Sequence, residues 1–214
     1  MRRPFIFVFA LLAGIIVFAQ IRTTQKNLPA GALDRQIYEH EGRLANTPAA
    51  FRASILRARL PGGAAIILGC QQEPKREWNP QGESLSQVLN ELTAADKSYR
   101  WEVQDGAINL LPTAGEPALL KTQLTEFKIE STSSLEVLNQ LKTKPQLQQA
   151  MLNLGLQEGV AIITYSPAPT TFSVRFEGGT LRQALNAIAV AHGSDVWDYQ
   201  ETRCGQRKQV IIRF

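Results

Sequence analysis

The sequence predicts an α+β fold of two tandem βαββαββ-type modules, with small mixed sheets packed on two helices each. The first observation is an internal repeat: at an offset of 96, 13 of the 42 positions from 63 to 104 are identical. Unrelated sequences would share about three, so the chain contains a duplicated unit. The second is strict apolar and polar alternation over 171–177, typical of a half-buried strand. The third is an apolar stripe at helical spacing over 181–189.

The repeat divides the chain into regions. We expect module 1 at 30–112 and module 2 at 124–214, because the identities and their flanking patterns fall there. The residues between them begin with Thr113-Ala114-Gly115-Glu116-Pro117-Ala118, which is rich in small residues and predicts a linker over 113–123. The polar residues 20–29 predict a flexible lead-in.

Module 2 shows the clearer order of elements. Ser133 and Thr180 are suitable N-caps, Pro145 suits a helix start, and Gly193 ends a helix. The predicted elements are strand 126–130, helices 133–141 and 145–154, strands 160–163 and 171–177, helix 180–192, and strands 196–202 and 209–214. The last two strands form a hairpin around Cys204-Gly205.

Module 1 repeats the later part of this order. We expect a strand at 64–68, a helix at 84–96 and a hairpin that turns at Asp105-Gly106. The segment 75–80 is charged and contains Pro80, so it predicts an edge strand or an irregular segment.

The first 19 residues predict a signal peptide. Arg2 and Arg3 precede an uncharged, mainly apolar run over 4–19, and Val17-Phe18-Ala19 suits a cleavage site. An apolar run of this length is short of the roughly 20 residues that span a bilayer. We therefore expect a periplasmic or secreted protein. The alternative is an uncleaved anchor in the inner membrane formed by residues 4–19.

Composition and charge exclude several classes of function. With 44% hydrophobic and 20% charged residues the chain is globular, and its net charge of +4 falls to +2 without Arg2 and Arg3. No concentrated basic surface is expected, so we predict no nucleic-acid partner; the densest stretch, Arg52 to Arg59, suits a solvated helix face. Two His and two Cys are too few for a conventional zinc site, and we expect no metal and no cofactor.

Three segments of module 2 form a recognisable pattern: Phe127-Lys128-Ile129, Val160-Ala161-Ile162-Ile163-Thr164-Tyr165, and the run from Phe172 to Leu185 with its Thr-Leu-x-x-Ala-Leu pattern. With these segments module 2 resembles the short N-terminal domain shared by secretins and TonB-dependent signalling receptors. It covers about 90 residues and extends more weakly to module 1. It implies two helices between small sheets, a periplasmic location and a protein-docking role, with no catalytic residues to transfer. We expect no pore-forming barrel after module 2, in contrast to secretins and receptors.

The two cysteines leave two alternatives open. Cys70 closes a predicted strand of module 1, and Cys204 lies at the hairpin tip of module 2. An exported protein can form disulfides, and a bridge would join the modules. Alternatively Cys70 is unpaired and partly buried, and Cys204 is unpaired and mobile. The spacing does not suit a redox pair.

Two tryptophans occupy equivalent repeat positions, Trp101 and Trp197. They either fill the core or form an exposed contact. Because Asp198 suits solvent, we expect the opposite face of its strand, with Trp197 and Tyr199, to point inward.

The polar residues do not suggest catalysis. His192 suits the C-terminus of a helix, His40 suits a charged surface, and Asp195 and Asp198 would face opposite sides of a strand. We see no nucleophile elbow and no phosphate loop, and we expect no catalytic site and no enzyme activity.

The sequence therefore predicts a non-enzymatic docking module of the bacterial cell envelope that is linked to secretion or receptor signalling, with an unidentified envelope protein as its partner. One alternative is a periplasmic protein that binds a small ligand between the modules, where the linker allows hinge motion. Another is a membrane-anchored subunit of a larger assembly. The membrane is a partner only if residues 4–19 stay uncleaved.

Overall fold

A computed structural model describes residues 27–38, 43–70, 74–159, 171–205 and 207–214. Its helices are α1 (Thr47–Ala58), α2 (Leu85–Ala95), α3 (Ser134–Lys142), α4 (Pro145–Leu154) and α5 (Leu181–His192), with short 3-10 helices η1 (Ala32–Asp34) and η2 (Ala118–Lys121). Its strands are β1 (Gln36–Tyr38), β2 (Arg43–Ala45), β3 (Gly62–Leu68), β4 (Arg76–Trp78), β5 (Gln81–Ser84), β6 (Tyr99–Gln104), β7 (Ala107–Pro112), β8 (Gln123–Leu124), β9 (Phe127–Thr132), β10 (Leu156–Glu158), β11 (Phe172–Phe176), β12 (Gly179–Thr180), β13 (Val196–Cys204) and β14 (Arg207–Arg213). The predicted α+β class is confirmed.

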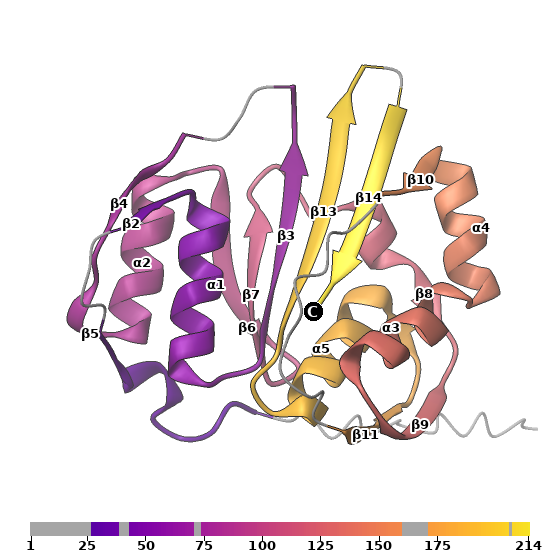
Figure 1. Ribbon diagram of the computed structural model, residues 1–214, viewed down its shortest axis with the longest axis horizontal. Coiled ribbons are helices and arrows are strands. Elements are labelled where there is room, and N and C mark those ends of the chain that lie inside the picture. The colour runs from indigo at the N-terminus through magenta and orange to yellow at the C-terminus, as the bar shows by residue number, and fades with distance from the viewer. Residues whose placement is uncertain (1–26, 39–42, 71–73, 160–170, 206) are drawn as a thin grey trace, which may run out of the picture.

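One six-stranded mixed sheet runs through the whole molecule, in the order β10-β14-β13-β3-β7-β6 (Figure 1). β3 is parallel to both β13 and β7, while β13–β14 and β6–β7 are antiparallel hairpins. The structure differs here from the expectation of small separate sheets, because strands from both halves of the chain share this one sheet. The short apolar strand β3 has partners on both sides, which suits its continuous apolar sequence.

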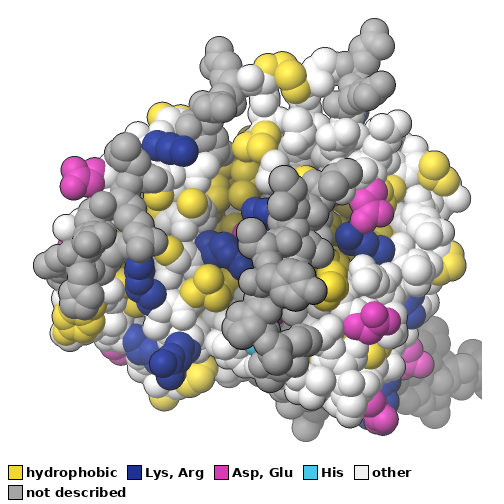
Figure 2. Space-filling view, in the orientation of Figure 1, with side chains coloured by type: hydrophobic (Ala, Val, Ile, Leu, Met, Phe, Trp, Pro, Cys, Tyr) yellow, Lys and Arg dark blue, Asp and Glu magenta, His cyan; other side chains and the backbone are white. Residues whose placement is uncertain are grey.

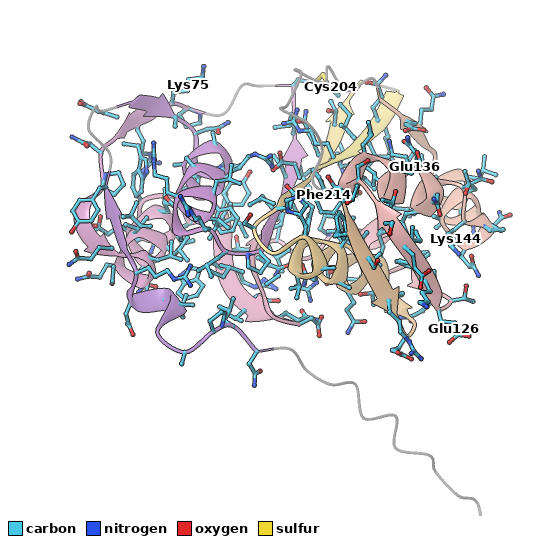
Figure 3. The ribbon with its side chains drawn as sticks, turned by 60° about the horizontal axis from the view of Figure 1, so that its bottom comes forward. Lys75, Glu126, Glu136, Lys144, Cys204 and Phe214 are labelled. Carbon is cyan, nitrogen blue, oxygen red and sulfur yellow. A yellow bond between two sulfur atoms is a disulfide. The ribbon has the colours of Figure 1, made fainter. Side chains whose placement is uncertain are left out.

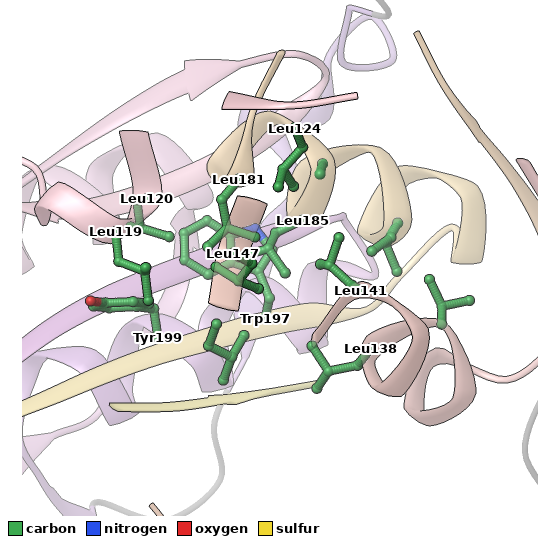
Figure 4. Close-up of a cluster of buried hydrophobic side chains, with 14 of the residues drawn as sticks. Leu119, Leu120, Leu124, Leu138, Leu141, Leu147, Leu181, Leu185, Trp197 and Tyr199 are labelled. Carbon is green, nitrogen blue, oxygen red and sulfur yellow. The ribbon is translucent and has the colours of Figure 1, made fainter. Parts of the chain in front are cut away.

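The helices of the two halves cover opposite faces of this sheet (Figure 1). Ala64 and Leu110 pack with α1 and α2, while their chain neighbours Ala65 and Leu111 pack with the core of α3, α4 and α5. Alternate residues of a strand point to opposite faces, so each half has its own core on its own face. The second core is centred on Trp197, Tyr199 and leucines of α3, α4, α5 and η2 (Figure 4).

Four small antiparallel ladders complete the fold. β1 pairs with β5 and β2 with β4 in the first half; β8 pairs with β12 and β9 with β11 in the second. Both helices that follow these ladders begin with a capping box, Ser84 with Gln87 for α2 and Thr180 with Gln183 for α5. A capping box satisfies two otherwise unpaired backbone N–H groups, which explains why these helix starts could be predicted.

Part of the predicted linker 113–123 is structured. Leu119 and Leu120 of η2 are fully buried. Thr113, Ala114 and Gly115 are exposed and lie in no helix or strand, as expected of a linker. The apolar residues after Ala118 pack against α5 and α4. The prediction missed this because it relied on the small residues, Gly and Pro of 113–118.

The predicted strand 160–163, the signal peptide and His40 lie outside the described residues. Segment 75–80 contains the short strand β4, which pairs only with β2 among the described strands, as expected for an edge segment. The hairpin turn at Asp105-Gly106 has positive φ at both residues, 53° and 76°. Such a two-residue turn matches the twist of its strands.

Candidate functional site

The boundary between the two halves is a hydrogen-bonded pair of parallel strands. β3 and β13 are in register over seven positions, from Gly62 opposite Val196 to Leu68 opposite Thr202. We call this pair the joint. The alternative expectation was a small-ligand site between the halves. At the joint, this place is occupied by two hydrogen-bonded strands.

Trp197 covers Gly63 across the joint. The two residues are direct partners in the register, and a Cβ atom at Gly63 would overlap the indole ring of Trp197. The indole N–H donates to Asn186 of α5 at 2.8 Å, and the side chain is fully buried. Only glycine leaves room for the ring at this position.

Trp101 has the same local arrangement at the edge of the sheet. Its indole N–H donates to Asn90 of α2 at 3.0 Å, which repeats the Trp197–Asn186 pair at the same spacing of 11 residues. Trp101 is half-buried, and β6 has no neighbour on its outer side among the described strands. Of the two predicted aromatic positions, one lies in the core and one at an open edge.

Cys70 and Cys204 form a disulfide, so the structure contains the bonded alternative. Their Cα atoms are 4.9 Å apart and their separation of 134 residues equals that of Gly62 and Val196 (196 − 62). The disulfide thus continues the register of the joint at its end, at the tip of the hairpin (Figure 3). It connects the two halves covalently.

Charged side chains also cross the joint. Arg52 of α1 donates to the backbone oxygen of Val196 at 2.6 Å and to Asp198 at 2.9 Å, and Arg213 approaches Asp198 at 3.2 Å. The expectation that Asp198 points to solvent was wrong: it is 5% exposed. The cause is that α1 of the first half covers the face of β13 opposite Trp197. Arg52, expected on a solvated helix face, therefore acts as a contact between the halves.

A second ion-pair group lies on the other side of the sheet. Arg182 of α5, whose side chain is 11% exposed, is 2.6 Å from Glu102 of β6 and 2.9 Å from Glu116. Removing one partner of such an ion pair lowers the stability of the folded protein, because the other partner keeps a buried charge that nothing compensates.

We expect Arg182→Ala to lower the free energy of unfolding by about 2–4 kcal/mol, because Glu116 would keep a poorly solvated charge without its partner. Arg175→Ala is the matched control, since the Arg175–Glu177 pair is 70% and 51% exposed and should contribute at most about 1 kcal/mol. Urea unfolding monitored by circular dichroism measures both. Equal losses in the two variants would contradict this assignment.

A buried polar group lies near the outer end of β13. Tyr199 donates to Glu201 at 2.7 Å, and Arg203 donates to the other oxygen of that carboxylate at 2.7 Å. Burial, the hydrogen bond to Glu201 and its negative charge raise the pKa of Tyr199, so the phenol stays protonated and remains a donor. Arg203, Lys208 and Leu156 line a hollow of about 220 Å³ above Glu201. The carboxylate already has two partners, so we see no free general base here.

An apolar hollow lies beside α4. A hollow of about 330 Å³, which we call the α4 groove, is lined by Lys142, Leu147, Gln148, Met151, Leu152, Leu156, Glu158, Val210 and Ile212. Leu152 at its rim is 74% exposed, and Lys142 and Glu158 form an ion pair at 2.6 Å. Sequence reasoning placed Leu152 in a helix but did not find this groove, because it depends on how α4 lies over β10 and β14.

The remaining candidates do not converge on a reactive centre. His192 lies in the last turn of α5 and its ring stacks edge-on against Phe172 at 5.4 Å. Within the described ranges, no three His, Cys, Asp or Glu residues are close enough to hold a metal ion. On the face in Figure 2, Lys and Arg side chains lie in separate groups among acidic, apolar and uncharged ones. No helix in the described part of the chain is long and apolar enough to cross a membrane.

Comparisons of this chain with models of known protein families, with curated proteins and with solved structures found no match.

Proposed function

We propose that the chain is an exported, non-enzymatic docking protein of the bacterial cell envelope, built from two duplicated modules that act as one rigid body. The duplication is supported by matching ladders: Gln36 pairs with Ser84 as Gln123 pairs with Thr180, and Ala45 with Arg76 as Thr132 with Phe172. The partners on the C-terminal side differ by 96 positions, as in the sequence repeat (180 − 84; 172 − 76).

The same ladders explain why the sequence repeat fades upstream. The N-terminal partners differ by 87 positions (123 − 36; 132 − 45), so module 2 has nine additional residues before β10 (96 − 87). Module 1 has one helix here, α1, where module 2 has two, α3 and α4. The additional length provides α4, which forms the wall of the α4 groove.

The joint is the observation that carries the proposal. Paired strands, a buried tryptophan and a disulfide fill the space between the modules, so the surfaces left for a partner lie on the outside. The exposed Leu152 beside the apolar α4 groove suits a protein partner, because interfaces bury apolar side chains in pockets. The export proposal rests on the N-terminal sequence, and the disulfide suits an oxidising compartment.

Site-specific photo-crosslinking in the envelope tests the proposal. A photoreactive residue at Leu152 is expected to give a discrete protein adduct, whereas one at Lys128, which is also exposed but does not line the groove, is expected to give none. The protein that is crosslinked from position 152 should copurify with the Lys128→Asp variant but not with the Leu152→Asp variant.

The small-ligand alternative predicts a different outcome, which thermal unfolding in the presence of candidate ligands would detect. Cell-wall fragments, sugars or metal ions would then raise the unfolding midpoint, because a ligand that binds only the folded state stabilises it. Such a shift, together with no adduct from Leu152, would overturn the docking proposal.

A further inference from the structure

The central sheet joins two equivalent three-stranded units head to tail. Module 2 contributes β10, β14 and β13, and module 1 contributes β3, β7 and β6, in the same order. In both units the first strand is parallel to the second strand of the hairpin, with Glu158 opposite Val210 and Gly62 opposite Ile108. The joint therefore connects the hairpin edge of module 2 to the first strand of module 1. The counterparts of these two edges, β6 and β10, have no outer neighbour among the described strands.

The register of the joint can be transferred to the two open edges. In the joint, Gly62 and Gly63 lie opposite Val196 and Trp197. Moving each residue to its repeat counterpart, at an offset of 96, places Glu158 opposite Arg100 and Gly159 opposite Trp101. Gly159 then lies opposite Trp101, where the Ile211 side chain, 2.7 Å from the place of a Cβ atom at Gly159, has to make room for the indole ring. The residues beside this pair, Glu158 and Arg100, carry opposite charges. Opposite charges directly across a strand pair stabilise it.

We propose that a second copy of this chain docks by β-strand addition, with its β6 parallel to β10 of the first copy. This inference rests on the proposed duplication and names the partner of the β10 edge. β6 and β10 point in the same direction across the sheet, because two of its strand pairs are antiparallel. The second copy then has the same orientation as the first, which makes the contact heterologous and open-ended.

The atoms at both edges suit this contact. Ile108 directs its N–H toward Pro61 at 3.1 Å, so Val103, which lies opposite Ile108 on β6, directs its own N–H away from β7. Trp101, two residues earlier on β6, therefore also directs its backbone N–H toward the open edge, where Gly159 would lie. Val103 is 44% exposed, and the Arg100 side chain is 45% exposed. On the other edge, Glu158 has a 56% exposed side chain.

The new contact lacks the covalent lock of the joint. Ser166 stands at the repeat position of Cys70, β6 ends at Gln104 before any counterpart of Cys204, and the chain has no further cysteine. The association is therefore reversible and depends on concentration. A contact between two copies that is this small is expected to be weak.

Sedimentation velocity of the processed, disulfide-bonded chain, from about 1 μM to about 1 mM, tests the proposal. The weight-average mass is expected to rise with concentration. Arg100→Glu and Glu158→Arg should each weaken association about tenfold or more, since like charges would face each other. The double variant Arg100→Glu/Glu158→Arg should return to within about threefold of the wild type.

Val103→Pro is a second, independent block, because proline removes an N–H that the chain itself does not use on this edge. Arg175→Glu on the distant strand β11 is the charge-matched control and should leave association unchanged. Circular dichroism confirms that each variant is folded. A wild type that stays monomeric to the highest concentration, or association that none of these edge variants alters, would overturn the proposal. Either result leaves envelope crosslinking from Leu152 unaffected, so the two proposals fail separately.

Discussion

Gly63→Ala is expected to lower the free energy of unfolding by about 3 kcal/mol or more. The added Cβ atom would overlap the indole of Trp197, which is fully buried and fixed by its hydrogen bond to Asn186. Neither side can move freely, because the backbone of Gly63 is in the register of β3 and β13. Overpacking of a rigid core site typically costs about 1–3 kcal/mol, and this site allows less relaxation than most.

Gly69→Ala is the matched control for this prediction. Gly69 lies just beyond the end of β3, and no atom lies within 4 Å of where its Cβ would be. Its replacement should change the free energy of unfolding by at most about 1 kcal/mol, with a small gain because alanine restricts the unfolded chain. Urea unfolding of both variants, followed by tryptophan fluorescence, gives the comparison. If Gly63→Ala proves as mild as Gly69→Ala, Trp197 does not lie against Gly63.

The same pair shows what the sequence could and could not predict. Both the glycines and the tryptophans are visible as repeat identities, Gly63 with Gly159 and Trp101 with Trp197. That Gly63 and Trp197 are partners depends on strands separated by 134 residues, and no local pattern encodes such a pairing. Helix α5, in contrast, follows from Thr180, Gln183 and Gly193, whose effects act within a few residues.

Asp198 illustrates the other source of error. A polar residue that alternates with Trp197 and Tyr199 suggests a strand with one wet face. In the structure both faces are covered, and Arg52, 146 residues away, makes the burial of Asp198 possible. The continuous apolar run of β3 was the available signal for a strand buried on both sides, and it indicates that helices cover its neighbours too.

The candidate docking surfaces depend on the same long-range arrangement. The exposure of Leu152 and the shape of the α4 groove follow from nine additional residues in module 2, which the 96-residue offset alone concealed. The open edges β6 and β10 could not be recognised until the strand order was known. The surfaces on which the proposed function depends therefore follow from how the two halves of the chain are joined.

Cys70→Ala/Cys204→Ala is expected to lower the free energy of unfolding by about 2–5 kcal/mol. The disulfide closes a loop of 134 residues, and the entropy that a cross-link removes from the unfolded chain grows with the length of the loop. A 100-residue loop corresponds to about 4.7 kcal/mol in the chain-entropy description, and measured values are often smaller. The double variant leaves no unpaired thiol, which separates loss of the bridge from new thiol chemistry.

Reductant provides the control, because it should lower the urea midpoint of the wild type to that of the double variant and leave the double variant unchanged. The bridge lies at the end of the joint, so its loss should also let the modules separate before either one unfolds. Hydrogen exchange measures this directly: the amides of β3 and β13 near Leu68 and Thr202 should lose protection first, while α2 and α5 keep theirs. Uniform loss of protection over both modules would instead mean that the joint and the two cores unfold as one unit. An unchanged midpoint would mean that the non-covalent joint alone holds the modules together.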